Sequence, residues 1–169
     1  MKCKLQSIYV GKAEACYIYT VELPHLNLPH ASFRIRDYGS YSQIFDQVRK
    51  RFVALTPEEW VRQNFLNFLI SEKQYPASLL GVEMQVKVNN LSQRADIVVY
   101  NKEGLPWMIV ECKSPAITLN EDVFYQAARY NSTLKVPYLI ITNGMEHYCL
   151  FFNGSEFEYH NDLPDFPSE

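Results

Sequence analysis

The chain has 169 residues, of which 47% are hydrophobic and 14% aromatic, so it is long enough to bury a core. Its net charge of −3 excludes a uniformly basic surface, so any contact with nucleic acid must use a local basic patch. The four cysteines form no CxxC pair, which argues against a zinc site and a dense disulfide framework. No apolar run approaches the roughly 18–20 residues of a membrane span. We expect a soluble, cytoplasmic protein.

The first 43 residues combine short β-prone runs with proline and glycine breakers. They predict an N-terminal extension of strands and loops over 1–43, packed on a main domain over 44–169. The main domain opens with a strand, a turn and a strand, and the basic cluster Arg49-Lys50-Arg51 falls at that turn. Two interpretations of the cluster stay open, a solvated turn and a contact with DNA.

A helix is predicted to begin after Thr56 and to run to about Lys73. Thr56 is a good N-cap, Pro57 suits the first helical position, and Glu59 stands where a capping box places its acid. The apolar positions at helical spacing are Val61, Phe65, Phe68 and Leu69, and they define the expected core face. Arg62 and Gln63 lie elsewhere on the wheel, and Arg62 is spaced either for a surface ion pair with Glu58 or for a phosphate contact.

The rest of the chain alternates β and α signals. The expected elements are strands over 82–88, 95–100 and 106–112, a helix over 120–134, and strands over 136–141 and 147–152. The final residues are expected to form a coil. The order α-β-β-β-α-β predicts an α/β fold with a mixed central sheet flanked by helices.

Charged residues converge at one end of this predicted sheet. Glu111 and Lys113 share one face of a strand with Trp107, and Asp96 lies across the hairpin within a register step of Glu111. Burying such charges is costly unless they are paired or bind a metal. Two carboxylates suit Mg²⁺ or Mn²⁺, and Lys113 could activate a water molecule or stabilise charge on phosphorus. These are the parts needed for phosphodiester hydrolysis.

Five ordered motifs resemble the N-terminal nuclease domain of type I restriction enzyme motor (R) subunits, within the PD-(D/E)XK nuclease superfamily. They are TPEEWVRQ at 56–63, RADIVVY at 94–100, ECKSP at 111–115, QAARYN at 126–131 and TNG at 142–144. The resemblance implies a restriction-endonuclease-like core. It also implies that Asp96 and Glu111 hold Mg²⁺, for which Mn²⁺ can substitute, that Glu58 reaches the metal through water, and that Lys113, Gln126 and Tyr130 are catalytic.

The chain contains no GxxxxGK[ST] loop, so we expect no ATP site and no motor. The resemblance then implies a Mg²⁺-dependent DNA endonuclease domain whose partners are DNA and restriction-system subunits supplied in trans. The alternative is a non-catalytic or weakly active module that retains the nuclease fold and binds DNA or a partner protein.

Overall fold

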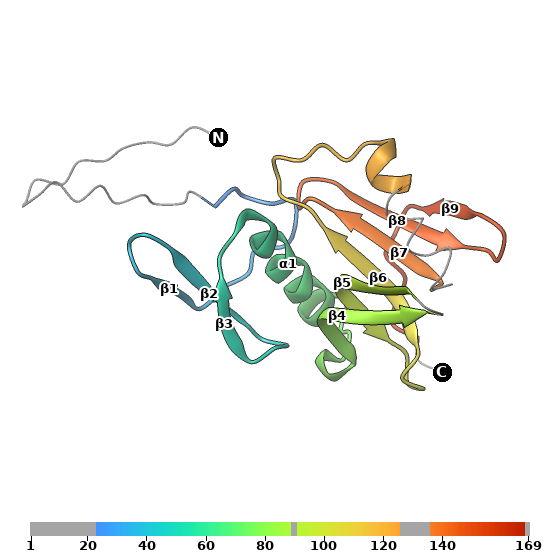
Figure 1. The fold of residues 1–169 in the computed structure, drawn as a ribbon, viewed down its shortest axis with the longest axis horizontal. Coiled ribbons are helices and arrows are strands. Elements are labelled where there is room, and N and C mark those ends of the chain that lie inside the picture. Colours follow the sequence, from blue (N-terminus) through green and yellow to red (C-terminus); the bar gives the residue numbers. More distant parts are fainter. Residues whose placement is uncertain (1–22, 89–90, 126–135, 168–169) are drawn as a thin grey trace, which may run out of the picture.

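The computed structural model describes residues 23–88, 91–125 and 136–167, which form two sheets and a central helix (Figure 1). The elements in these ranges are β1 Ile35–Asp37, β2 Ser42–Asp46, β3 Arg51–Ala54, α1 Pro57–Asn67, a π-helical turn Phe68–Glu72, a 3₁₀ turn Ala77–Leu79, β4 Leu80–Val88, β5 Leu91–Tyr100, β6 Pro106–Cys112, β7 Tyr138–Thr142, β8 His147–Phe152 and β9 Phe157–His160. Strand β9 was not predicted from the sequence.

The first three strands form a small antiparallel sheet in the order β1-β2-β3. The register pairs Ile35 with Ile44 and Phe45 with Phe52. The predicted strand-turn-strand is therefore confirmed, with the basic cluster in its turn. Strand β2 crosses the division expected between residues 43 and 44, and the division into domains stays a prediction.

The six-stranded sheet has the order β4-β5-β6-β7-β8-β9. Only β6 and β7 run parallel among these described strands, and the other neighbours are antiparallel, which confirms the predicted mixed sheet. A parallel pair requires a crossover connection, and this one passes through a helical turn at 121–125. Asn120 caps that turn, because its side-chain oxygen accepts a hydrogen bond from the Val123 backbone N–H at 3.3 Å. The remainder of the helix predicted over 120–134 lies outside the described residues.

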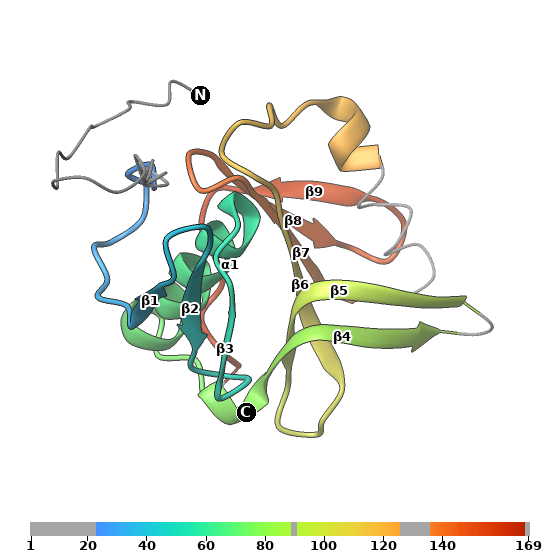
Figure 2. The same ribbon diagram turned by 60° about the vertical axis from the view of Figure 1, so that its left-hand side comes forward.

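Helix α1 begins as predicted, with the Thr56 hydroxyl accepting the Glu59 backbone N–H at 3.0 Å. The Glu59 carboxylate is not used as a capping-box acid, because arginine and glutamine side chains surround it instead. Figures 1 and 2 show α1 lying between the two sheets. The helix is consequently buried on both sides. Arg62 and Gln63, which lie off the predicted apolar face, are therefore also buried, at 4% and 1% exposed.

The core consists of two apolar clusters, one on each face of the six-stranded sheet. The cluster under α1 includes Val61, Phe65, Leu66, Ile97, Met108, Val110 and Ile140. The cluster on the opposite face includes Val98, Ile109, Leu139, Ile141 and Leu150, with Phe124 packed against it. Cys112 belongs to the first cluster and is fully buried, as expected of a core residue. Within the described parts of the chain, no helix is both long and apolar enough to span a membrane.

A β-bulge changes the side to which Trp107 packs. Val99 pairs with Met108, but Tyr100 pairs with Pro106, so Trp107 is an extra residue in β6. Its ring contacts Tyr75 and therefore joins the cluster under α1. The prediction that Trp107 shares a face with Glu111 was wrong, because strict alternation fails at a bulge.

Candidate functional site

Asp96, Glu111 and Lys113 meet where the pairing of β5 with β6 stops, at the end of β6 and the middle of β5. Ile97 is paired with Val110 in this antiparallel pair of strands. Asp96 precedes Ile97 and Glu111 follows Val110, so the two acidic residues are neighbours across the strands. The Asp96 Oδ2 atom also accepts the Cys112 backbone N–H at 2.7 Å, which fixes the carboxylate against β6. The register step predicted from the sequence is thus present in the structure.

Glu111 and Lys113 form a partly buried ion pair. The Lys113 Nζ atom lies 2.8 Å from Glu111 Oε1, and the two side chains are 23% and 19% exposed. Burial raises the pKa of the Glu111 carboxyl, and the negative charge of Asp96 raises it further. Burial opposes the charge of Lys113, but the hydrogen bond and charge of Glu111 outweigh it and raise the pKa of the ammonium group. The site therefore holds more negative charge than Lys113 alone compensates.

Arg62 brings a second cation to the site from α1. Its Nη2 atom lies 2.6 Å from Asp96 Oδ1 and 3.0 Å from Glu58 Oε1, and its Nη1 atom is ion-paired with Glu59. The predicted pair between Arg62 and Glu58 exists, but the Arg62 side chain is only 5% exposed, so the expectation of a surface bridge was wrong. Although burial opposes the charge, Asp96 and Glu59 raise the pKa of the guanidinium.

Arg49 extends this arrangement into a buried network. Its guanidinium lies 2.5 Å from Asp46, 2.6 Å from Glu59 and 2.5 Å from Glu83. The Arg49 side chain is 10% exposed, so neither a solvated turn nor a DNA contact describes it. Lys50 and Arg51 of the same cluster are exposed. Sequence reasoning missed Asp46, Arg49 and Glu83 because no local spacing shows that the β2–β3 turn reaches α1 and β4.

The carboxylate oxygens of Asp96 and Glu111 are the donors that Mg²⁺ and Mn²⁺ prefer, and the excess negative charge favours a cation, so this donor set fits the expected metal. Within the described residues there is no group of three or more His, Cys, Asp or Glu side chains arranged to hold a metal ion. The Glu58 side chain is 46% exposed and contacts Arg62. Its role as a metal ligand stays a prediction. Gln126 and Tyr130 lie outside the described residues.

Comparisons with known proteins match a family model and a solved structure among others. The family model described as "Type I restriction enzyme R protein N terminus (HSDR_N)" matches residues 57–167. The solved structure is a fragment described as an HsdR subunit of a type I restriction enzyme from Vibrio vulnificus YJ016, with 17% identity and a TM-score of 0.49. The match covers 66% of this chain and 24% of that one. The search of curated proteins returned no match.

Proposed function

Because the chain belongs to the family of type I restriction enzyme R protein N termini, we propose that it is a metal-dependent DNA endonuclease domain that hydrolyses phosphodiester bonds. The observation that carries this proposal is the meeting of Asp96, Glu111 and Lys113 where the pairing of β5 with β6 stops. Two partly buried carboxylates repel each other, and a divalent cation would relieve that repulsion.

Each residue has a distinct part in the proposed reaction. Asp96 and Glu111 would hold Mg²⁺ or Mn²⁺, and Glu58 would reach it through water. The cation supplies Lewis-acid polarisation of the scissile phosphate. Lys113 would place its ammonium beside the phosphate and stabilise the negative charge that develops there, held in position by its contact with Glu111. The proposal also gives Gln126 and Tyr130 the catalytic roles that the family resemblance implies for them.

The setting in which the domain acts is part of the proposal. These 169 residues carry no nucleotide-binding GxxxxGK[ST] motif, and in the proposal DNA translocation and sequence recognition come from other parts of a restriction system. The matched part of this chain spans 24% of the length of the solved fragment with which it was compared. We place this activity in the cytoplasm.

Nicking of supercoiled plasmid tests the proposal. With Mg²⁺ or Mn²⁺ the wild-type chain should convert plasmid to open circles, and EDTA should stop the conversion. Glu111→Gln and Lys113→Met should each lower the rate by at least about 100-fold, the usual scale for removing an electrostatic or acid–base group. Glu103→Gln and Lys102→Met are matched controls on the exposed β5–β6 turn and should keep the rate. Equal nicking by all five proteins would mean a contaminating nuclease and would refute the proposal.

A non-catalytic binding module is the second candidate, favoured by the ion pairs that Arg62 already makes with Glu58 and Asp96. Calorimetric titration with MnCl₂ separates the two. The nuclease requires Mn²⁺ binding that Asp96→Asn abolishes. A binding module predicts no Mn²⁺ binding and DNA binding that is unchanged in Glu111→Gln.

A further inference from the structure

The small sheet carries a concentration of basic residues that the proposed cleavage site does not use. Residues 34–54 contain five basic and two acidic side chains, although the whole chain has a net charge of −3. One of the five, Arg49, is buried in its ion-pair network. The other four, Arg34, Arg36, Lys50 and Arg51, are exposed, and we call them the basic sheet patch.

Two of these cations are held in place by aromatic rings. Phe45 and Phe52 are paired across β2 and β3, and their rings lie 5.2 Å apart. The Arg34 guanidinium lies 3.5 Å above the centre of the Phe45 ring, and that of Arg36 lies 3.7 Å above the Phe52 ring. Stacking restricts the side chains and leaves their N–H groups free to point outward. The rings are covered by arginines, so this surface suits phosphates better than stacked bases.

A hollow of about 330 Å³ lies beside the patch, between the small sheet and α1. Its polar lining is Ser32, Arg34, Gln47, Lys50, Gln63 and Asn67. Among the described residues that line it there is no carboxylate. A hollow with two cations and several neutral donors favours an anion such as a phosphate group.

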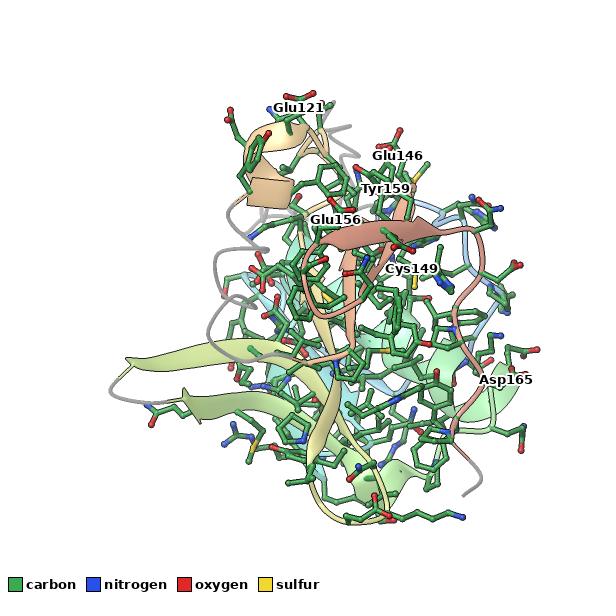
Figure 3. The ribbon with its side chains drawn as sticks, turned by 90° about the vertical axis from the view of Figure 1, so that its right-hand side faces the viewer. Glu121, Glu146, Cys149, Glu156, Tyr159 and Asp165 are labelled. Carbon is green, nitrogen blue, oxygen red and sulfur yellow. The ribbon has the colours of Figure 1, made fainter. Side chains whose placement is uncertain are left out.

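Exposed acidic side chains occur elsewhere in the molecule. Figure 3 labels four of them, Glu121, Glu146, Glu156 and Asp165, none of which belongs to β1–β3. All four side chains are exposed. This uneven distribution of charge would orient the molecule so that the small sheet approaches a polyanion first.

We propose that the basic sheet patch holds the phosphate backbone of duplex DNA, apart from the Asp96 site. The identity of the polyanion rests on the proposed nuclease function, while the patch itself rests on the charges and stacking above. Contacts of this kind position a duplex without reading its sequence.

Fluorescence anisotropy with a labelled duplex, in EDTA, tests the proposal without any cleavage. The double variant Arg34→Gln/Arg36→Gln should bind at least about tenfold more weakly at low salt, and the slope of log K against log salt should fall by about 1.8, since each lost phosphate contact removes about 0.9. Arg34→Lys/Arg36→Lys keeps both charges and should retain most of the affinity.

Lys102→Glu is the charge-matched control, because it also lowers the net charge by two but lies on the β5–β6 turn. It should bind DNA like wild type. The proposal is overturned if wild type does not bind, if Lys102→Glu loses as much affinity as the glutamine double variant, or if the lysine double variant loses as much. Tighter binding of wild type to single-stranded DNA than to duplex DNA of equal length would overturn the proposal that the patch holds a duplex.

The absence of nuclease activity and the absence of DNA binding by the patch are separate results. A chain that binds through the patch but never nicks plasmid would retain this inference and lose the proposed function.

Discussion

The Arg62 guanidinium and the Asp96 carboxylate form an ion pair, 2.6 Å between Nη2 and Oδ1, that joins α1 to β5. The Arg62 side chain is 5% exposed and that of Asp96 is 17% exposed, so water screens the pair weakly. Arg62 also contacts Glu58 and Glu59. One cation thus fixes the carboxylate expected to bind metal and compensates part of the negative charge around it.

We predict that Arg62→Met destabilises the protein by about 3–5 kcal/mol, because it removes the arginine counter-ion of Asp96 and one of the two arginines that neutralise Glu59. Urea unfolding followed by circular dichroism measures this. If Asp96 binds a divalent cation, MnCl₂ should raise the Tm of Arg62→Met more than that of wild type, since the metal would replace the lost positive charge.

Arg94→Met is the control for this prediction. Arg94 is ion-paired with Glu83 in the same region, but its side chain is 62% exposed. Its removal should cost at most about 1 kcal/mol, as for other exposed ion pairs. Equal losses of unfolding free energy in Arg62→Met and Arg94→Met would show that the burial of Arg62 does not determine its contribution to stability.

The second prediction concerns the buried carboxylate of Asp46. It is fully buried, and it accepts hydrogen bonds from the Arg49 backbone at 2.7 Å, from Arg49 Nε at 2.5 Å and from Gln63 at 2.8 Å. Although burial opposes ionisation, these bonds lower the pKa of Asp46. Asp46→Asn should therefore cost about 3 kcal/mol near neutral pH.

The pH dependence of this loss follows from the lowered pKa. Asp46 contributes stability above its unfolded value of 3.8, and that contribution disappears as pH falls through its lower folded value. The difference in unfolding free energy between wild type and Asp46→Asn should consequently shrink below about pH 3.8. A difference that stays constant through this range contradicts the prediction.

Local patterns predicted most of the described elements, though not β9, and the Asp96–Glu111 register, because caps, turns and alternation act between residues close in sequence. They did not predict that β1–β3 cover the second side of α1, so the burial of Arg62 and Gln63 was missed. That burial is set by contacts such as Gln63 with Asp46, 17 residues apart. The bulge at Trp107 likewise depends on pairing with β5 and has no signal in β6 alone.

His147 should make stability depend on pH near neutrality. Its ring nitrogens lie 2.9 Å from the Asn27 carbonyl oxygen and 2.7 Å from Thr142 Oγ1. Burial lowers the pKa of His147 below 6.5, and the Asn27 contact opposes this only in part. The unfolded chain then binds more protons, so stability falls as pH drops from 6.5 toward the folded value.

Thermal unfolding of wild type and His147→Gln between about pH 7.5 and 5 checks the direction of this pH dependence. The range brackets the ordinary histidine pKa of about 6.5. Wild type should lose more stability on acidification than the variant does. Parallel curves would mean that His147 does not contribute. Other titrating groups are common to both proteins and cancel in the comparison.

Gly144 links the β7–β8 turn to α1, and we predict that replacing it with alanine is costly. Its φ is +83°, and a Cβ atom there would lie 2.8 Å from Leu26 Cδ2 and 3.1 Å from Val61 Cγ2. Gly104 has a similar φ of +77°, but no described atom lies within 4 Å of its Cβ position. Gly104→Ala should cost about 1 kcal/mol for backbone strain alone, and Gly144→Ala at least about 1 kcal/mol more because of overpacking. Urea unfolding of both variants gives the difference, and equal losses would show that the packing of Leu26 and Val61 against the turn adds nothing to backbone strain.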